Sequence, residues 1–136
     1  MAEAIFRHKV IAAGLDEHFH IESAGTGDWH VGDNPDPRTI KVLHANGVTE
    51  YSRARQLQSS DFDTFDFIIA MDLANVRDIN NWQGAQPKKV SLMLSWNPNS
   101  TEIEVPDPYY GDQSDFKKVF EMLEESTEAM LTKLRN

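Results

Sequence analysis

The stretch Phe67-Ile68-Ile69-Ala70-Met71-Asp72 decides the fold class of this chain. An unbroken apolar run of this length is typical of a parallel strand that is covered on both faces. Asp72 is a good N-cap, so we expect a helix to begin at Leu73 and to run to about Asn81. A buried strand followed at once by a helix is the repeating unit of α/β proteins.

Helical and strand patterns alternate on both sides of this unit. We expect helices over residues 2–13, 37–45 and 112–135, a helical turn at 61–65, and strands at 19–23 and 90–94. Gly14 and the pair Asn46-Gly47 supply helix ends. The last helix carries a stripe of residues that we expect to be buried: Phe116, Val119, Phe120, Leu123, Met130, Leu131 and Leu134. The alternation predicts one α/β domain over residues 1–136.

Composition narrows the classes of function. A chain of 136 residues with 40% hydrophobic content can bury a real core. A formal charge of −9 and a pI near 4.9 argue against nucleic acid or an anionic membrane as partner. No apolar run could span a bilayer and no secretory signal is visible, so we expect a cytoplasmic protein. With no cysteine and no ligand-like spacing of its histidines, the chain is expected to hold no metal or other cofactor.

The stretch Val105-Pro106-Asp107-Pro108-Tyr109-Tyr110-Gly111 carries the strongest hint of chemistry. Each proline fixes its own φ and restricts the residue before it, so the carboxyl of Asp107 is held in a defined direction. A carboxyl beside aromatic surface can act as a general acid when burial raises its pKa. The alternative is an ordinary proline-rich turn with surface tyrosines, and the residue types alone favour that alternative.

Motifs along nearly the whole chain resemble those of one family and occur in its order. The matching stretches are Ser23-Ala24-Gly25-Thr26, Asp28-Trp29-His30-Val31-Gly32, Pro35-Asp36-Pro37-Arg38, Ala54-Arg55-Gln56, Asp61-Phe62 with Phe65-Asp66, Ala70-Met71-Asp72 with Asn75, and residues 105–111. The chain resembles the low-molecular-weight protein tyrosine phosphatases. That resemblance implies a three-layer α/β/α fold, with a small parallel sheet of four strands and a site at the strands' carboxyl ends.

The resemblance also implies an activity and a set of site residues. The family hydrolyses phosphotyrosine esters, in proteins or small aryl phosphates, through a cysteinyl-phosphate formed on a Cys-x5-Arg loop. Asp107 matches the acid that protonates the leaving phenol and later activates the water. Trp29, Tyr109 and Tyr110 match positions that line the crevice for phosphotyrosine, and His30 matches a more variable position on its rim.

The sequence departs from the family where the nucleophile belongs. In the family Met-Ala-Glu commonly follows the phosphate loop, whereas here Met1-Ala2-Glu3 opens the chain. We therefore expect the first strand, the cysteine and the phosphate-binding arginine to be missing. Ser52 stands where many members have a histidine that helps to order the phosphate loop. Losing the buried side chains of a central strand removes about 8 to 15 kcal/mol of stabilising free energy. We therefore expect a marginally stable or unfolded monomer unless another segment takes the place of that strand.

Three interpretations stay open. We favour an incomplete copy of an active phosphatase, inactive as it stands. The second is a non-catalytic relative that binds phosphotyrosine or another partner. The third is a dimer or strand-exchanged assembly, in which a strand from the edge of another chain takes the place of the missing strand. Among the other polar residues, we expect Arg38 and Arg55 to lie on the surface or to anchor loops, and Asp72 to cap a helix or to be a buried hydrogen-bonding acid.

Overall fold

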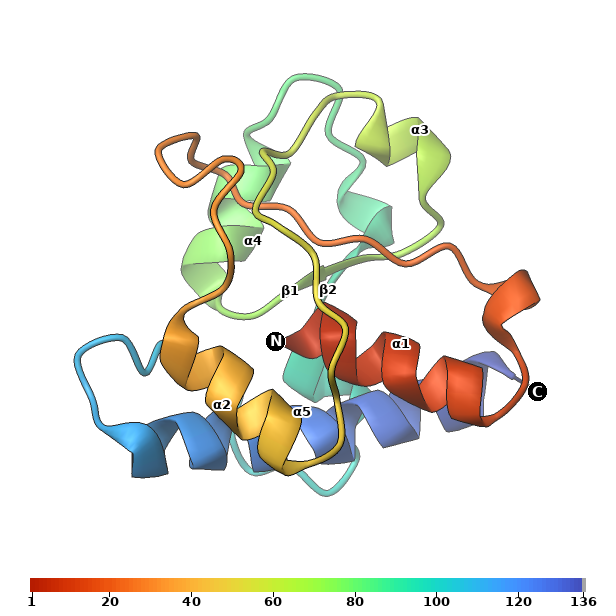
Figure 1. Cartoon of the computed structure of the whole chain (residues 1–136). Coiled ribbons are helices and arrows are strands. Elements are labelled where there is room, and N and C mark those ends of the chain that lie inside the picture. Colours follow the sequence, from red (N-terminus) through yellow and green to blue (C-terminus); the bar gives the residue numbers. More distant parts are fainter. Residues whose placement is uncertain (136) are drawn as a thin grey trace.

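A two-stranded parallel sheet forms the centre of the computed structural model, which describes residues 1–135 (Figure 1). In that sheet β1 (Ile68–Ala70) pairs with β2 (Val90–Leu92), and Ile68 lies opposite Val90. Five α-helices accompany it among the described residues: α1 (Ala2–Ala12), α2 (Pro37–Ala45), α3 (Asp61–Thr64), α4 (Leu73–Asn80) and α5 (Gln113–Leu134). Short 3-10 turns lie at Asp16–His18, Pro87–Lys89 and Met93–Trp96.

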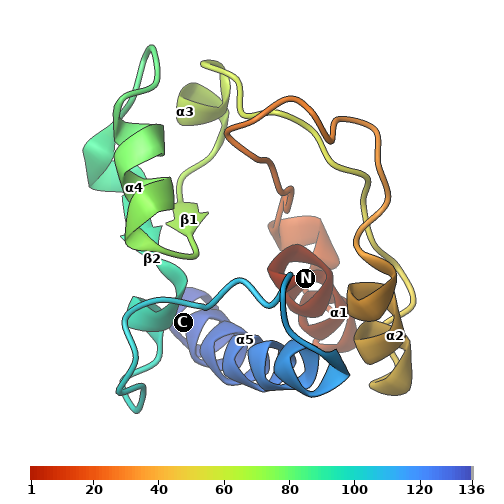
Figure 2. The same ribbon diagram turned by 90° about the vertical axis from the view of Figure 1, so that its left-hand side faces the viewer.

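The helices form layers on the two sides of the sheet (Figure 2). α1, α2 and α5 pack together on one side, and their core includes Ile5, Val10, Leu43, Phe120 and Leu123. On the other side, α3 and α4 contribute to a smaller core. That core is made of Leu57, Phe62, Ala70 and Ile79. The expected α/β class with a small parallel sheet flanked by helices is therefore confirmed.

Most of the expected helices form, because their end signals are local. Asp36 caps α2 by accepting the Arg38 amide at 2.8 Å, and Pro37 occupies the first helical position. α1 ends before Gly14, whose φ of 73° lies in the left-handed region that favours glycine. α5 begins at a capping box formed by Asp112 and Asp115. Along α5 the expected stripe is buried, except that Leu134 is only half-buried.

The strand expected at 19–23 is wrong. In the described structure this segment is extended but belongs to no strand, and a single parallel bridge joins Gly25 to Gln56. A strand exists only where its edges find partners, and one side of this segment borders a cavity. The strand expected at 90–94 ends at Leu92 and continues as a 3-10 turn. Of the four strands implied by the family resemblance, two are present among residues 1–135.

Among residues 1–135, no helix is both long and apolar enough to cross a bilayer.

Candidate active site

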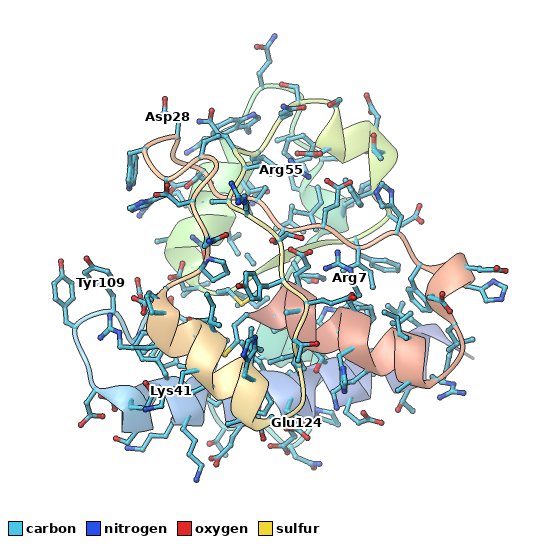
Figure 3. The ribbon with its side chains drawn as sticks, in the orientation of Figure 1. Arg7, Asp28, Lys41, Arg55, Tyr109 and Glu124 are labelled. Carbon is cyan, nitrogen blue, oxygen red and sulfur yellow. The ribbon has the colours of Figure 1, made fainter. Side chains whose placement is uncertain are left out.

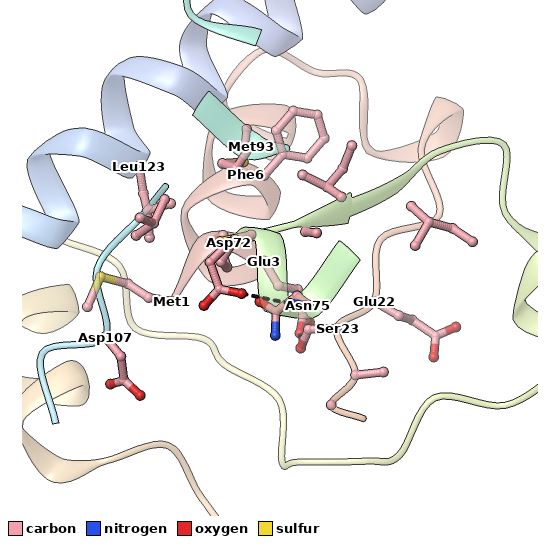
Figure 4. A pocket seen from close by; sticks show the side chains of 18 of the residues that line it. Met1, Glu3, Phe6, Glu22, Ser23, Asp72, Asn75, Met93, Asp107 and Leu123 are labelled. Atoms are coloured by element: carbon pink, nitrogen blue, oxygen red, sulfur yellow. Dashed lines mark hydrogen bonds between the residues drawn. The ribbon is translucent and has the colours of Figure 1, made fainter. Parts of the chain in front are cut away.

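A cavity of about 600 Å³ lies between β1 and the segment 21–25 (Figure 4). Apolar side chains from both layers of helices and from the sheet line its interior. They include Met1, Phe6, Met71, Ile79, Leu123 and Met130. Asp72 and Asp107 line the cavity where β1 ends, at its carboxyl end, which is where open α/β sheets place their ligands.

The loop that carries Asp107 is fastened to the end of β1. The Val105 amide donates to the carbonyl of Met71 at 2.9 Å, which fixes where the loop begins. The Asp107 carboxylate accepts the amide of Tyr109 at 3.0 Å, forming a local turn that limits the carboxylate's orientation. Asp107 is exposed at the mouth of the cavity. The expectation of a directed carboxyl thus has a structural basis, but burial of that carboxyl is not found.

Arg38, in the first turn of α2, anchors the same loop. Its guanidinium donates to the carbonyls of Tyr109 at 2.9 Å and Gly111 at 3.0 Å, and it stacks over Phe116 at 4.4 Å. Hydrogen bonds with Arg38 also hold the pKa of Asp36 below its ordinary value of 3.8. Arg38 is therefore a loop anchor, as expected, and its donors are engaged with protein groups.

Asp72 is a helix cap. Its carboxylate accepts the backbone amide of Asn75 at 2.7 Å and so satisfies one of the free N–H groups at the start of α4 (Figure 4). The first amide of that helix, on Leu73, donates instead to Glu104 at 2.8 Å. The helix start is thus held by two carboxylates, one on each side.

The four expected rim residues do not form one cluster. Tyr109 lines the main cavity with Asp107, whereas Trp29 and His30 line a second cavity of about 340 Å³. Tyr110 borders neither cavity and is 97% exposed. Figure 3 shows Tyr109 and Asp28, the neighbour of Trp29, on the same side of the molecule but on separate loops. The two cavities share the segment 23–25, so the aromatic residues lie around one region without touching across it.

Glu3 connects three parts of the chain beside the cavity. Its carboxylate accepts hydrogen bonds from Ser23 and, at 2.6 Å, from Ser52, and it pairs with Arg7 at 2.6 Å. Burial raises the pKa of Glu3, but these three partners outweigh burial and lower the pKa below its ordinary 4.5. Sequence reasoning did not single out Glu3. The only signal was an acid in the first turn of α1, which is common in helices of any function.

Arg55 is also committed to structural contacts. It binds Asp61 in a bidentate pair at 2.9 and 3.1 Å and reaches Glu22 at 3.1 Å. Asp61 is buried, which raises its pKa, but the bond to Arg55 and the amide of Gln58 lower the pKa below 3.8. Arg55 therefore anchors the loop before α3, in agreement with the expectation that it lies on the surface or anchors a loop.

The cavity lining carries an excess of negative charge. Its carboxylate side chains are Glu3, Glu22, Asp36, Asp61, Asp72 and Asp107, and its one basic side chain is Arg55. Arg55 is already paired with two of these acids. Among residues 1–135, no three acidic or histidine side chains are grouped closely enough to hold a metal ion.

The cavity and its acid-bearing loop lie at the carboxyl end of a parallel sheet, which is where open α/β folds bind their ligands. Comparison with known proteins identifies the family. The family model described as low molecular weight phosphotyrosine protein phosphatase matches residues 1–136. The chain belongs to that family.

Individual relatives agree with this assignment. A low molecular weight phosphotyrosine protein phosphatase of Schizosaccharomyces pombe is 48% identical over 119 residues, covering 85% of this chain and 76% of that protein. The protein of the same description from Sus scrofa is 38% identical and covers 99% of this chain and 87% of its own length. A crystal structure of a protein tyrosine phosphatase from Entamoeba histolytica, 34% identical, superposes with a TM-score of 0.91 and covers 98% of this chain and 86% of its own.

Proposed function

We propose that these 136 residues supply the leaving-group acid and the aromatic rim for hydrolysis of phosphotyrosine esters, and that they cannot by themselves form the phosphoenzyme. One observation carries the proposal: Asp107 stands at the mouth of the cavity, at the end of β1, in a family member that contains no cysteine. The family's chemistry needs a thiolate, because sulfur attacks phosphorus and holds the phosphoryl group as an intermediate.

Asp107 would act when the ester bond breaks. Its carboxyl proton passes to the phenol oxygen as the bond between that oxygen and phosphorus breaks, so the leaving group departs as neutral phenol. Such general acid catalysis contributes on the order of 10²- to 10⁴-fold, but only to a reaction that already has a nucleophile. The turn made with the Tyr109 amide and the anchoring of the loop by Arg38 support this role, because both restrict where the carboxyl points.

The two serine hydroxyls beside Glu3 are poor substitutes for the thiolate. Ser23 and Ser52 are the hydroxyls beside Glu3, and both donate to its carboxylate. A serine becomes nucleophilic when an adjacent base takes its proton. Glu3 is a poor base because its pKa is held below 4.5 by Arg7 and by these same hydroxyls. We therefore expect no serine-based reaction in its place.

The aromatic residues Trp29, Tyr109 and Tyr110 would contact the phenyl ring of the substrate, with His30 at the rim. Their exposure supports this, since Trp29 is 77% and Tyr109 58% exposed. Tyrosine and tryptophan are enriched at binding surfaces, because each combines an apolar ring with a polar tip. The substrate class that fits is a phosphotyrosine side chain or a small aryl phosphate.

The second interpretation, a non-catalytic phosphotyrosine binder, has less support. A phosphate dianion needs cations or free N–H groups, whereas the cavity lining holds six acids and a single, already paired arginine. Weak or absent binding of a phosphotyrosine peptide, measured by calorimetry, is therefore expected. Micromolar binding would favour this alternative.

The test compares hydrolysis of an aryl phosphate by the 136-residue chain and by a version in which an apolar strand and a Cys-x5-Arg loop are joined in front of Met1. We expect turnover only in the second protein. In that protein, Asp107→Asn should lower kcat by about 10²- to 10⁴-fold, while Asp66→Asn, at an exposed acid outside both cavities, should leave kcat unchanged. Robust turnover by the 136-residue chain would refute the proposal.

A further inference from the structure

Trp29 packs its indole ring on the backbone of Gly27, two residues earlier in the same loop. Asp28, the residue between them, lies at the edge of the molecule (Figure 3). A methyl group on Gly27 would overlap Cη2 and Cζ3 of the indole and would lie 2.9 Å from its Cε3. Non-bonded carbon atoms pack best at about 3.5 to 4.0 Å, so no side chain fits between the two residues. The benzo edge of Trp29 therefore occupies the space that a side chain at position 27 would fill.

Position 27 requires glycine for space and not for backbone conformation. The φ of Gly27 is not positive, so its backbone does not lie in the left-handed region that favours glycine. Gly32, at the other end of the loop, is the opposite case. Its φ is 86°, whereas a methyl group there would meet nothing within 4 Å. Of these two glycines, Gly27 is therefore the one whose missing side chain determines where another side chain lies.

One neighbouring segment holds both ends of the loop that carries Trp29. The Gly25 amide donates to the Arg55 carbonyl at 2.9 Å, before the loop begins. The Gly32 amide donates to the Ala54 carbonyl at 2.8 Å, where the loop ends. Because the backbone is held on both sides of Trp29, the position of the indole depends mainly on what its side chain meets within the loop.

The contact with Gly27 leaves most of the indole open to solvent. Trp29 is 77% exposed, and the ring of His30 lies edge-on to it with the ring centroids 6.1 Å apart. Gly27, Trp29 and Ala54 together line the second cavity. One side of the indole is thus seated on backbone, and the exposed remainder is available to pack against a flat aromatic ring.

We propose that Gly27 is a positioning residue: by leaving room for the benzo edge of Trp29, it sets the orientation in which the indole meets the phenyl ring of a substrate. This inference rests on the proposed function, which assigns Trp29 to recognition of that ring. Gly27→Ala should turn the indole and leave the backbone in place, because the overlapping atoms lie at the far end of a rotatable side chain. The substitution should therefore weaken recognition of the ring and not recognition of phosphate.

NMR measures the contact itself and needs no catalysis. It is applied to the 136-residue chain and to the joined version, in which the strand and the Cys-x5-Arg loop precede Met1. Nuclear Overhauser effects should link the α-protons of Gly27 to the benzo protons of Trp29. Gly27→Ala should move the Trp29 resonances, whereas Gly25→Ala, where a methyl group would meet the Gly27 carbonyl oxygen at 4.0 Å, should not. Absence of these Overhauser effects from the joined version would overturn the proposal.

Calorimetry with two ligands of the joined version measures recognition. Benzylphosphonate carries a phenyl ring, and inorganic phosphate does not. Aromatic pairs of this kind contribute about 2- to 10-fold in affinity, so Gly27→Ala should raise the Kd of benzylphosphonate by about that factor and change the Kd of phosphate by less than about twofold. Equal changes for the two ligands would show that Gly27 serves only the structure of the loop, and would overturn the proposal.

A double-mutant cycle tests whether Gly27 acts through Trp29. In a Trp29→Ala background, Gly27→Ala should change the Kd of benzylphosphonate no further, because the ring that it displaces is already gone. An undiminished effect of Gly27→Ala in that background would overturn the proposal. These measurements do not depend on turnover, so a joined version that binds benzylphosphonate but hydrolyses no aryl phosphate would refute the proposed function and leave the role of Gly27 to be decided by the cycle.

Discussion

Single residues around the cavity divide into those that hold the structure and those left free to react. Arg38, Arg55 and Glu3 use their charged groups on protein partners: Arg38 binds the Tyr109 carbonyl at 2.9 Å, Arg55 binds Asp61 at 3.1 Å, and Glu3 pairs with Arg7 at 2.6 Å. Asp107 has one backbone donor, from Tyr109, and is exposed. Asp107 thus keeps its carboxylate open to solvent, which the proposed role in protonating the leaving group requires.

Glu3 gives a prediction about stability and pH. Glu3→Gln removes the ion pair with Arg7 at a side chain that is 6% exposed, so the free energy of unfolding at pH 7 should fall by about 1 to 3 kcal/mol. Because the folded state holds the pKa of Glu3 below 4.5, the unfolded state binds this proton more readily. The contribution of Glu3 is therefore complete above pH 4.5 and is lost as the pH falls through the folded-state pKa.

Urea unfolding at pH 7 and at pH 3 measures both effects. The difference between the parent chain and Glu3→Gln should be largest at pH 7 and should shrink at pH 3. Glu17→Gln, at an exposed residue of the first 3-10 turn, should change neither value. A difference that grows toward acid would show that the hydrogen bonds of Glu3 do not favour its charged form.

At the scale of elements, Asp72 is predicted to act through α4 and not through chemistry. Asp72→Ala should lower the free energy of unfolding by about 1 kcal/mol, because the Asn75 amide loses its acceptor. Asp72→Asn should retain most of the stability, since asparagine is also a good cap. Asp78→Ala, on the exposed surface of the same helix, is the control. Equal losses for Asn and Ala at position 72 would contradict a capping role.

The elements that the sequence predicted well are those fixed by local signals. Asp36 with Pro37, Asp72 and Asp112 all begin helices where expected, because a cap acts on amides two or three residues away. Segment 19–23 has the composition of a strand, but strand pairing depends on distant parts of the chain, and this segment borders the main cavity. The local composition of a segment does not predict whether a distant part of the chain pairs with it.

The candidate site was predictable in part for the same reason. Asp107 and Tyr109 are neighbours in one motif and do share the main cavity. Glu3 contacts Ser23, 20 residues away in the sequence, and Ser52, 49 residues away. The local sequence around these residues does not predict either contact. The separation of Trp29 and His30 from Tyr109 into two cavities was likewise not visible in the motifs.

At the scale of the whole molecule, the open main cavity predicts low stability. A cavity of about 600 Å³ removes packing partners from β1 and from the core side of α1 and α5. We expect a free energy of unfolding at or below about 5 kcal/mol, the lower end of the range for natural domains. Urea denaturation followed by tryptophan fluorescence measures it. A cooperative monomer with about 10 kcal/mol of stability would show that the main cavity is closed in solution.

The most direct test of the account asks whether these 136 residues can carry a phosphoryl group. The chain is mixed with an aryl phosphate, quenched in denaturant and weighed by intact mass spectrometry, with the version joined to the Cys-x5-Arg loop as positive control. Because the chain contains no cysteine, we expect its mass to stay unchanged while the control gains one phosphoryl group. A phosphorylated side chain anywhere in the 136 residues, formed during turnover, would contradict the account.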